Sequence, residues 1–310
     1  MRHTAVLCLA ALAACGPRAG VETVPGPRAV VIDSVLLIRD ISVLSHDSME
    51  GRLVGTPGSA RARAYLESRF RQAGLEPVAG QSYLQPFEFM RGNPPAATSG
   101  VNIIGVVRGT ELPARYIVVT AHYDHVGIRE GQIYNGADDN ASGTAALMAL
   151  ARTFTQSKPR HSMIFVAFDA EEGGLRGARH FVGDLPVAKD AIVLNVNMDM
   201  VSRSDAGELY VAGTARYPHL LPPVQRAIAV AEVKLLTGHD VAGTGRDDWT
   251  SQSDHGAFHA AGIPFLYFGV EDHPDYHRPT DDFEKVDPGF YVRSVRTIAA
   301  AVRILDRDLP

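Results

Sequence analysis

Residues 163–177 read Met-Ile-Phe-Val-Ala-Phe-Asp-Ala-Glu-Glu-Gly-Gly-Leu-Arg-Gly. The first six are apolar and mostly bulky, which is typical of a fully buried strand. Because the glycines end that strand, Glu171 and Glu172 follow directly on a core element, where unpaired negative charge is costly. In such a pair, one glutamate can bind a metal ion while the other acts as a base on metal-bound water. A Glu-Glu pair without other metal-binding residues nearby would instead be a solvent-exposed acidic turn.

Strands and helices alternate on both sides of this stretch. Apolar runs predict strands at 101–107, 116–120, 163–168, 191–197, 208–212 and 264–268. Amphipathic spacing and capping residues predict helices at 32–44, 59–73, 142–155, 176–182, 220–231, 253–260 and 288–305. The alternation predicts an α/β fold, a single domain with a mixed, mostly parallel central sheet flanked by helices.

Carboxylates and imidazoles follow the predicted strands. In α/β sheets, ligands bind outside the carboxyl ends of the strands. The side chains expected at that edge are His122, Asp124, Asp138, Asp139, Glu171, Glu172, Asp199, Tyr276 and His277. Carboxylates mixed with imidazoles, without a thiolate, suit zinc or a neighbouring first-row ion. Converged carboxylates would repel each other without a cation, so the sequence predicts a metal site.

The N-terminus is predicted to be an export signal. A short basic lead precedes an apolar run over 4–14 that is too short to be a permanent membrane span. The run ends in Leu12-Ala13-Ala14-Cys15, which resembles the lipobox of bacterial lipoproteins. We therefore expect a lipoprotein signal peptide at 1–14, a lipidated N-terminus and tether at 15–30, and a folded domain at 31–310. An ordinary cleaved signal with a chance cysteine is the alternative.

Cysteine content and charge limit the possible partners. Cys8 would leave with the signal and Cys15 would carry the lipid, so the mature domain has no disulfide and no catalytic thiol. The net charge of −5 and the lack of a Lys/Arg stripe argue against nucleic-acid binding. We expect an exported cell-envelope lipoprotein, on the periplasmic or outer-surface side, that contacts the membrane only through the lipid on Cys15 and is a monomer.

Five motifs occur in a specific order: His-x-Asp at 122–124, Gly-Ala-Asp-Asp-Asn-Ala-Ser-Gly at 136–143, Glu-Glu-Gly-Gly-Leu-Arg-Gly at 171–177, Asn-Met-Asp-Met at 197–200 and Tyr-His-x-x-x-Asp at 276–281. In this order they resemble the M28 family of di-zinc exopeptidases, the bacterial secreted aminopeptidases in particular. The resemblance runs from about Leu44 to the C-terminus. It implies that 31–310 is an M28-type peptidase domain with the zinc-exopeptidase, phosphorylase/hydrolase-like fold.

The resemblance also implies a ligand set. Asp139 would bridge two zinc ions, with Co²⁺ or Mn²⁺ as possible substitutes. Glu172 and His277 would complete one site, and His122 and Asp199 the other. A bridging carboxylate neutralises and spaces two cations about 3.5–4 Å apart, which gives this arrangement a physical basis.

Three catalytic roles follow from the same resemblance. Glu171 would be the general base towards a two-metal-activated water. Asp124 would orient His122, because an imidazole ligand needs its other N–H fixed by an acceptor. Tyr276 would help to hold the developing oxyanion, although a purely structural role for it stays open. The peptide bond from Asp139 to Asn140 is expected to be cis.

Other polar residues near the motifs are expected outside the ligand set. His125, His255 and His273 are interpreted as outer-shell or rim residues. Asp254 is expected to hydrogen-bond into the site, and no Gly-x-Ser-x-Gly turn exists to expose a serine nucleophile beside it. Trp249, the single tryptophan, either lines the substrate pocket or packs in the core.

The leading hypothesis is a zinc-dependent aminopeptidase acting on peptide or protein N-termini. Alternatives within the fold are a glutaminyl cyclase-like acyltransferase with a single zinc and another M28 specificity, such as a carboxypeptidase or dipeptidase. A metal-stabilised binding lipoprotein is a third, non-catalytic alternative. The retained Glu171 argues against it, since a structural site needs closed coordination and no base.

Overall fold

The computed structural model describes Met1 and residues 31–310 except 79 and 81. The predicted tether, Cys15 and, apart from Met1, the predicted signal peptide lie outside the described residues, so these assignments stay predictions. Within the described part of the chain, none of the helices combines the length and apolar character needed to cross a bilayer.

A nine-stranded sheet forms the centre of the domain, in the order β1-β3-β7-β4-β8-β11-β9-β10 with β2 beside β3. Its parallel centre consists of β7 (His161–Phe168), β4 (Leu112–His122), β8 (Ile192–Met198) and β11 (Phe265–Gly269). The flanking strands are β1 (Glu76–Pro77), β2 (Leu84–Arg91), β3 (Ala96–Val107), β9 (Glu208–Ala212) and β10 (Lys234–Thr237). Since β3 is antiparallel to β7 and β9 to β11, the predicted mixed sheet is confirmed.

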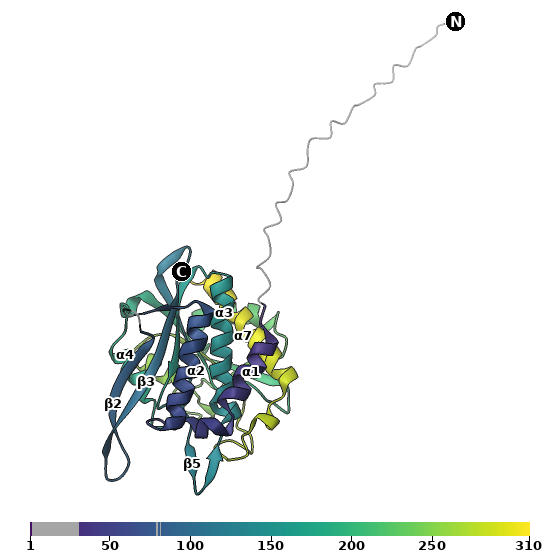
Figure 1. Ribbon diagram of the computed structural model, residues 1–310. Helices are drawn as coiled ribbons and strands as arrows, with labels where there is room; N and C mark the ends of the chain where they lie inside the picture. Colours follow the sequence, from purple (N-terminus) through teal and green to yellow (C-terminus); the bar gives the residue numbers. More distant parts are fainter. Residues whose placement is uncertain (2–30, 79, 81) are drawn as a thin grey trace.

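Helices cover both faces of the sheet. Figure 1 shows one layer side by side, formed by α1 (Ser34–Leu44), α2 (Pro57–Ala73), α3 (Gly143–Gln156) and α7 (Pro288–Asp308). The shorter α4 (Arg176–Gly183) and α6 (His255–Ala260) pack on the other face, and α5 (Leu221–Ile228) packs on α7. Along β4, Ile117 and Val119 join the first core and Val118 the second, as the two-residue period of a strand requires.

Local signals explain both ends of α2, which ends where the sequence predicted but begins two residues earlier. Thr56 caps α2 through its side chain, Pro57 occupies the first turn, and Gly74 ends the helix in the left-handed conformation (φ 78°). The sequence missed β1, β2, β10 and the small ribbon of β5 (Gly127–Arg129) and β6 (Gln132–Tyr134). Strand β2 contains Pro86 and is largely exposed, so neither propensity nor apolar alternation marked it.

Arg52 ties together the loops that carry the polar edge of the sheet. Its side chain is fully buried and donates to the main-chain carbonyls of Leu44, Tyr123, Asn135 and Gly136 at 2.6–2.9 Å. Burial lowers the pKa of Arg52 to about 10, with nearby carboxylates opposing the shift, so the guanidinium stays charged at neutral pH. One side chain therefore fixes both the loop after β4 and the loop before α3.

Replacing Arg52→Met should lower the free energy of unfolding by about 3 kcal/mol or more, because buried carbonyls would lose their donors. Urea denaturation followed by circular dichroism measures the change. Arg61→Met is the matched control: Arg61 pairs with Glu50 at 2.8 Å, but both side chains are more than a third exposed. That variant should change stability by less than about 1 kcal/mol. Equal effects of the two substitutions would contradict the anchoring role of Arg52.

Candidate active site

The carboxyl ends of the four parallel strands meet at one edge of the sheet, and the predicted site residues lie there. His122 is the last residue of β4, and Asp199 directly follows β8. Glu171 and Glu172 lie in the turn between β7 and α4. His277 comes from the long loop after β11. The structure thus brings together residues that are up to 155 positions apart in the sequence.

Two clusters of ligand-type atoms share Asp139. In the first, His122 Nε2 lies 3.4 Å from Asp139 Oδ1 and 3.2 Å from Asp199 Oδ1. In the second, His277 Nε2 lies 2.9 Å from Asp139 Oδ2 and 3.2 Å from Glu172 Oε2. The two oxygens of Asp139 therefore face different clusters, as a carboxylate that bridges two metal ions must.

His125 lies in the second cluster, where the sequence did not place it. Its Nδ1 is 2.7 Å from Glu172 Oε1 and 3.7 Å from Asp139 Oδ2, and the side chain is fully buried. His125, Asp139 and Glu172 can offer ligand atoms that all lie within 4.8 Å of one another. No sequence motif predicts this position, because His125 follows the His-x-Asp motif without belonging to it.

The chemistry of this donor set fits a divalent cation. Asp139 Oδ2, Glu172 Oε1 and both ring nitrogens of His125 are buried without a hydrogen-bond partner in the described chain. Burial and the neighbouring Glu172 raise the pKa of Asp139. Burial also opposes ionisation of Glu172, but His125 and His277 hold its pKa below the usual range. Buried carboxylate oxygens and imidazole nitrogens that lack partners are the ligands that zinc takes in proteins.

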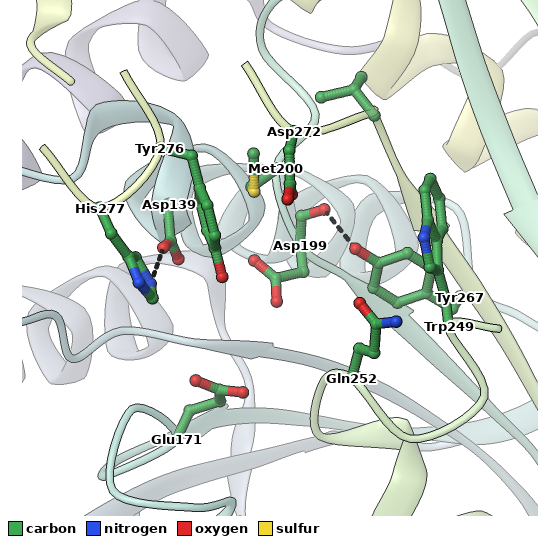
Figure 2. A pocket seen from close by; sticks show the side chains of 11 residues that line it. Asp139, Glu171, Asp199, Met200, Trp249, Gln252, Tyr267, Asp272, Tyr276 and His277 are labelled. Atoms are coloured by element: carbon green, nitrogen blue, oxygen red, sulfur yellow. Dashed lines mark hydrogen bonds and ion pairs between the residues drawn. The ribbon is translucent and has the colours of Figure 1, made fainter. Parts of the chain in front are cut away.

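The two adjacent glutamates point in different directions. Ala170, just before them, has a left-handed backbone (φ 59°), which turns the chain sharply at the end of β7. Glu172 reaches the second cluster, whereas the Glu171 carboxylate lines a pocket together with Asp139, Asp199 and Tyr276 (Figure 2). Burial, followed by the nearby Asp254 and Asp199, raises the pKa of Glu171 well above its usual range.

Asp124 contacts both the imidazole of His122 and the main chain of Glu171. His122 Nδ1 is 3.2 Å from the main-chain oxygen of Asp124 and 3.7 Å from its carboxylate Oδ1. The same Oδ1 accepts a hydrogen bond from the Glu171 main-chain N–H at 2.9 Å. The main chain of Asp124 is therefore the nearer acceptor for His122, and its carboxylate fixes the turn that carries Glu171.

Tyr276 lies over the pocket with its ring stacked on His277, at a centroid distance of 4.0 Å. Burial raises the pKa of Tyr276, so the phenol stays protonated and can donate a hydrogen bond. Figure 2 shows the hydroxyl end of this ring pointing between Asp139 and Asp199. On the far side of the pocket, Tyr267 donates to the main-chain oxygen of Asp199 at 3.1 Å.

The loop of Asp139 is held by the carboxylates of Asp281 and Asp138. Asp281 accepts hydrogen bonds from the main-chain N–H groups of Asp138 and Asp139 at 3.1 Å. Asp138 in turn accepts from the Ser202 hydroxyl at 2.8 Å and lies 3.2 Å from His273 Nε2, so His273 is an outer residue as expected. The peptide bond after Asp139 is cis, which confirms that prediction.

The remaining candidates lie around the pocket. Trp249 fulfils both alternatives, because it lines the pocket and also packs in a buried cluster with Phe265 and Tyr267. His255 Nε2 lies 2.8 Å from the main-chain oxygen of Trp249, outside both clusters. The hydrogen bond expected from Asp254 is not present: both of its carboxylate oxygens are buried without a partner in the described chain.

Comparison with known proteins gives a consistent result. The family model described as "Peptidase family M28" matches residues 102–302, more than half of the chain. Aminopeptidase YwaD of Bacillus subtilis is 33% identical over 214 residues, which cover 65% of this chain and 44% of the relative. The chain spans less than half the length of the curated relatives that it matches.

Solved structures share the fold. The chain resembles a zinc aminopeptidase from Bacillus subtilis with a TM-score of 0.73 at 20% identity, over 89% of this chain and 96% of the other. It resembles the glutaminyl cyclase of Porphyromonas gingivalis with a TM-score of 0.69 at 18% identity, over 91% of this chain and 100% of the other. At these sequence identities, structural similarity establishes the fold only. The reaction depends on which residues occupy the site of this chain.

Proposed function

This chain belongs to peptidase family M28, and on that premise we propose that it is a zinc-dependent aminopeptidase that hydrolyses N-terminal residues from peptides. The observation that carries the proposal is the placement of Asp139, whose two oxygens face two separate ligand clusters. His122 and Asp199 would hold one zinc ion, and Glu172 and His277 the other. When bound, zinc supplies Lewis acidity that polarises the scissile carbonyl and lowers the pKa of water.

Glu171 supplies the proton transfers. Its carboxylate lines the pocket but lies outside the candidate ligand clusters, so it is free to take a proton from the attacking water and to deliver it to the leaving amine. The hydrogen bond that the Glu171 main-chain N–H donates to the Asp124 carboxylate fixes the turn that presents Glu171. The protonated phenol of Tyr276 donates a hydrogen bond to the developing oxyanion.

The pocket supports action on a free N-terminus. Asp199, Glu171 and Asp272 line it and attract the α-ammonium group of a peptide, which an internal peptide bond does not offer. Its other walls include Met200, Tyr267, Trp249 and Val270. Acidic first residues would face the carboxylate of Asp272, so we expect a lower kcat/KM for them.

Elemental analysis of the purified protein, combined with a panel of aminoacyl anilides, tests this function. We expect two zinc ions per chain and release of N-terminal residues, with acidic ones cleaved least. One zinc per chain together with cyclisation of N-terminal glutamine would favour the glutaminyl cyclase alternative. Cleavage of C-terminally free or dipeptide substrates alone would favour the other M28 specificities. Zinc-replete protein without turnover on any of these would favour a binding lipoprotein.

We further propose that the protein is exported and anchored to the cell envelope through a lipid on Cys15, as the lipobox-like segment suggests. Metabolic labelling with a radioactive fatty acid in a bacterial host should mark the wild-type chain, which should sediment with membranes. Cys15→Ala should remove the label and release at least about nine-tenths of the protein into the soluble fraction, because a single membrane attachment is lost. A labelled Cys15→Ala chain, or unlabelled wild type, would contradict the anchor.

A further inference from the structure

We propose that the pocket selects substrates with a positively charged first side chain, as in peptides that begin with arginine or lysine, and that Asp272 pairs with this charge. The inference rests on the proposed function, because it takes the pocket beside the ligand clusters as the place where a peptide N-terminus binds. It goes beyond the poor cleavage of acidic first residues, since it names the class of substrate that binds best.

The catalytic pocket borders a second cavity. Val270 and Asp272 line both spaces. The catalytic pocket has a volume of about 50 Å³, and the second cavity has a volume of about 200 Å³. The walls of the second cavity come from the loop after β11, from the connection between β8 and β9, and from β9 itself, and they include Arg203, Glu208 and Tyr210. A long first side chain therefore has room beyond the smaller catalytic pocket, along the wall that Val270 and Asp272 form.

Asp272 lies where the first side chain of a substrate has to go. The scissile carbonyl must lie beside Glu171 and the two ligand clusters, so the first side chain has to extend towards the other walls of the pocket. Among the described residues, the candidate metal clusters do not include Asp272. Figure 2 shows the Asp272 carboxylate pointing towards the interior of the pocket. This carboxylate is therefore placed to contact the first side chain.

The shared wall has the two parts that a long cationic side chain needs. Val270 offers an apolar surface to the methylene groups, and the neighbouring carboxylate of Asp272 offers a partner to the charged end. Lysine and arginine both combine an apolar stem with a terminal cation. The Asp272 side chain is 60% exposed, so a substrate can reach it without any movement of the protein.

The two basic side chains in the walls of the second cavity already have acidic partners. Arg203 Nη1 lies 2.7 Å from Asp275 Oδ2, and His273 Nε2 lies 3.2 Å from Asp138 Oδ2. Each of these pairs uses a carboxylate other than Asp272. Neither basic group therefore neutralises the negative charge that Asp272 presents to both spaces.

The cation that pairs with Asp272 in the structure is Arg246, and this pair is weak. Arg246 Nη2 lies 3.9 Å from Asp272 Oδ2, which is too far for a hydrogen bond, and the Arg246 side chain is 97% exposed. Such exposed pairs contribute little to stability, because water solvates both charges well. A guanidinium or ammonium group of a bound substrate can displace Arg246 and approach Asp272 more closely.

Arginine and citrulline anilides isolate the charge of the first side chain. The two side chains have nearly the same size and shape, but only that of arginine is charged. Both substrates carry the same α-ammonium group, so the ratio of their kcat/KM values cancels the contribution of that group. We expect kcat/KM of the zinc-loaded wild type to be higher for arginine by at least about 10-fold, the lower end of what a hydrogen bond to a charged group contributes.

Two variants test whether Asp272 causes this preference. Asp272→Asn should lower the arginine-to-citrulline ratio by at least about five-fold, because the amide keeps the size of the side chain and removes its charge. Glu111→Gln is the matched control, because it also removes one negative charge from a side chain that is 60% exposed. Glu111 directly precedes β4, at the opposite end of that strand from His122, and lines neither space. This variant should leave the ratio unchanged.

Binding of the two free amino acids gives a measurement that needs no turnover. By calorimetry, the zinc-loaded wild type should bind arginine at least about 10-fold more tightly than citrulline, and Asp272→Asn should reduce this difference at least about five-fold. If Asp272→Asn hydrolyses neither anilide, the binding ratio decides. Circular dichroism confirms that each variant is folded.

Failure of this inference can be told apart from failure of the proposed function. If the zinc-loaded wild type hydrolyses no aminoacyl anilide, the proposed function fails and the inference fails with it. If wild type hydrolyses anilides with an arginine-to-citrulline ratio below about 10, the proposed function stands and the selection of basic residues is overturned. A ratio that falls less than about five-fold in Asp272→Asn would show that another group recognises the charge, which overturns the role of Asp272.

Discussion

Glu171→Ala should bind as much zinc as the wild type while kcat falls by about 10²–10⁴-fold. That range is the usual contribution of a positioned general base. The carboxylate lines the pocket and lies outside both ligand clusters, so its removal takes away the proton carrier without opening a coordination position. Steady-state hydrolysis of an aminoacyl anilide, with elemental analysis of the same preparation, measures both quantities.

Matched variants test whether the two adjacent glutamates differ in role. Glu171→Gln keeps the size of the side chain and should be nearly as inactive, because an amide cannot accept the proton. Glu172→Gln should instead weaken zinc binding at the cluster of His277 and His125, since Glu172 lies within 3.2 Å of both imidazoles. Full activity of Glu171→Ala would contradict its role as the general base. If Glu171→Ala loses zinc while Glu172→Gln keeps its full zinc content, the roles of the two glutamates are reversed.

Asp139→Ala should lose both zinc ions and, with them, all measurable peptidase activity. One oxygen of Asp139 faces each cluster, so a single substitution removes a ligand from both sites. Zinc at 1,000 times its dissociation constant stabilises a protein by about 4 kcal/mol per site, so the zinc-dependent rise in melting temperature should disappear as well. Zinc analysis and thermal melts with and without added metal measure these effects.

Asp199→Ala is the matched comparison for the bridge. Asp199 contacts only the cluster of His122, so this variant should retain one zinc ion and about half of the zinc-dependent stabilisation. If Asp139→Ala and Asp199→Ala lose the same single ion, Asp139 is not shared between the sites. The single-zinc alternative would then gain support.

The sequence predicted the elements and the edge at which the chemistry lies. The buried strand at 163–168 and the glycines that follow place two glutamates at a strand exit, because apolar runs and turn residues act locally. Parallel neighbours then place the exits of β4, β7, β8 and β11 at one edge, since strands that run in one direction end on one side. The fold and a metal-binding edge follow from these local signals alone.

The sequence did not predict the edge strands or the buried hydrogen bonds of Arg52. Strand β2 is largely exposed and contains Pro86, so its pairing with β3 depends on a partner that periodicity does not reveal. Arg52 is an arginine in a loop of turn residues, where a solvated side chain is the ordinary outcome. In the structure, Arg52 is buried because it donates hydrogen bonds to main-chain carbonyls in loops more than 70 positions away in the sequence.

Sequence alone therefore determined which residue types meet at the end of the sheet, and tertiary structure decided what each of them faces. The sequence alone does not tell the roles of Glu171 and Glu172 apart, because the two residues are adjacent. In the structure, the chain turns sharply at Ala170, so that Glu171 lines the pocket and Glu172 contacts two imidazoles. His125 belongs to no motif. Its ring packs against the main chain at Gly136, where a Cβ atom would collide with it. The physical reason is that strand and helix signals are local in the chain, whereas coordination depends on distances of a few ångströms between segments far apart in sequence.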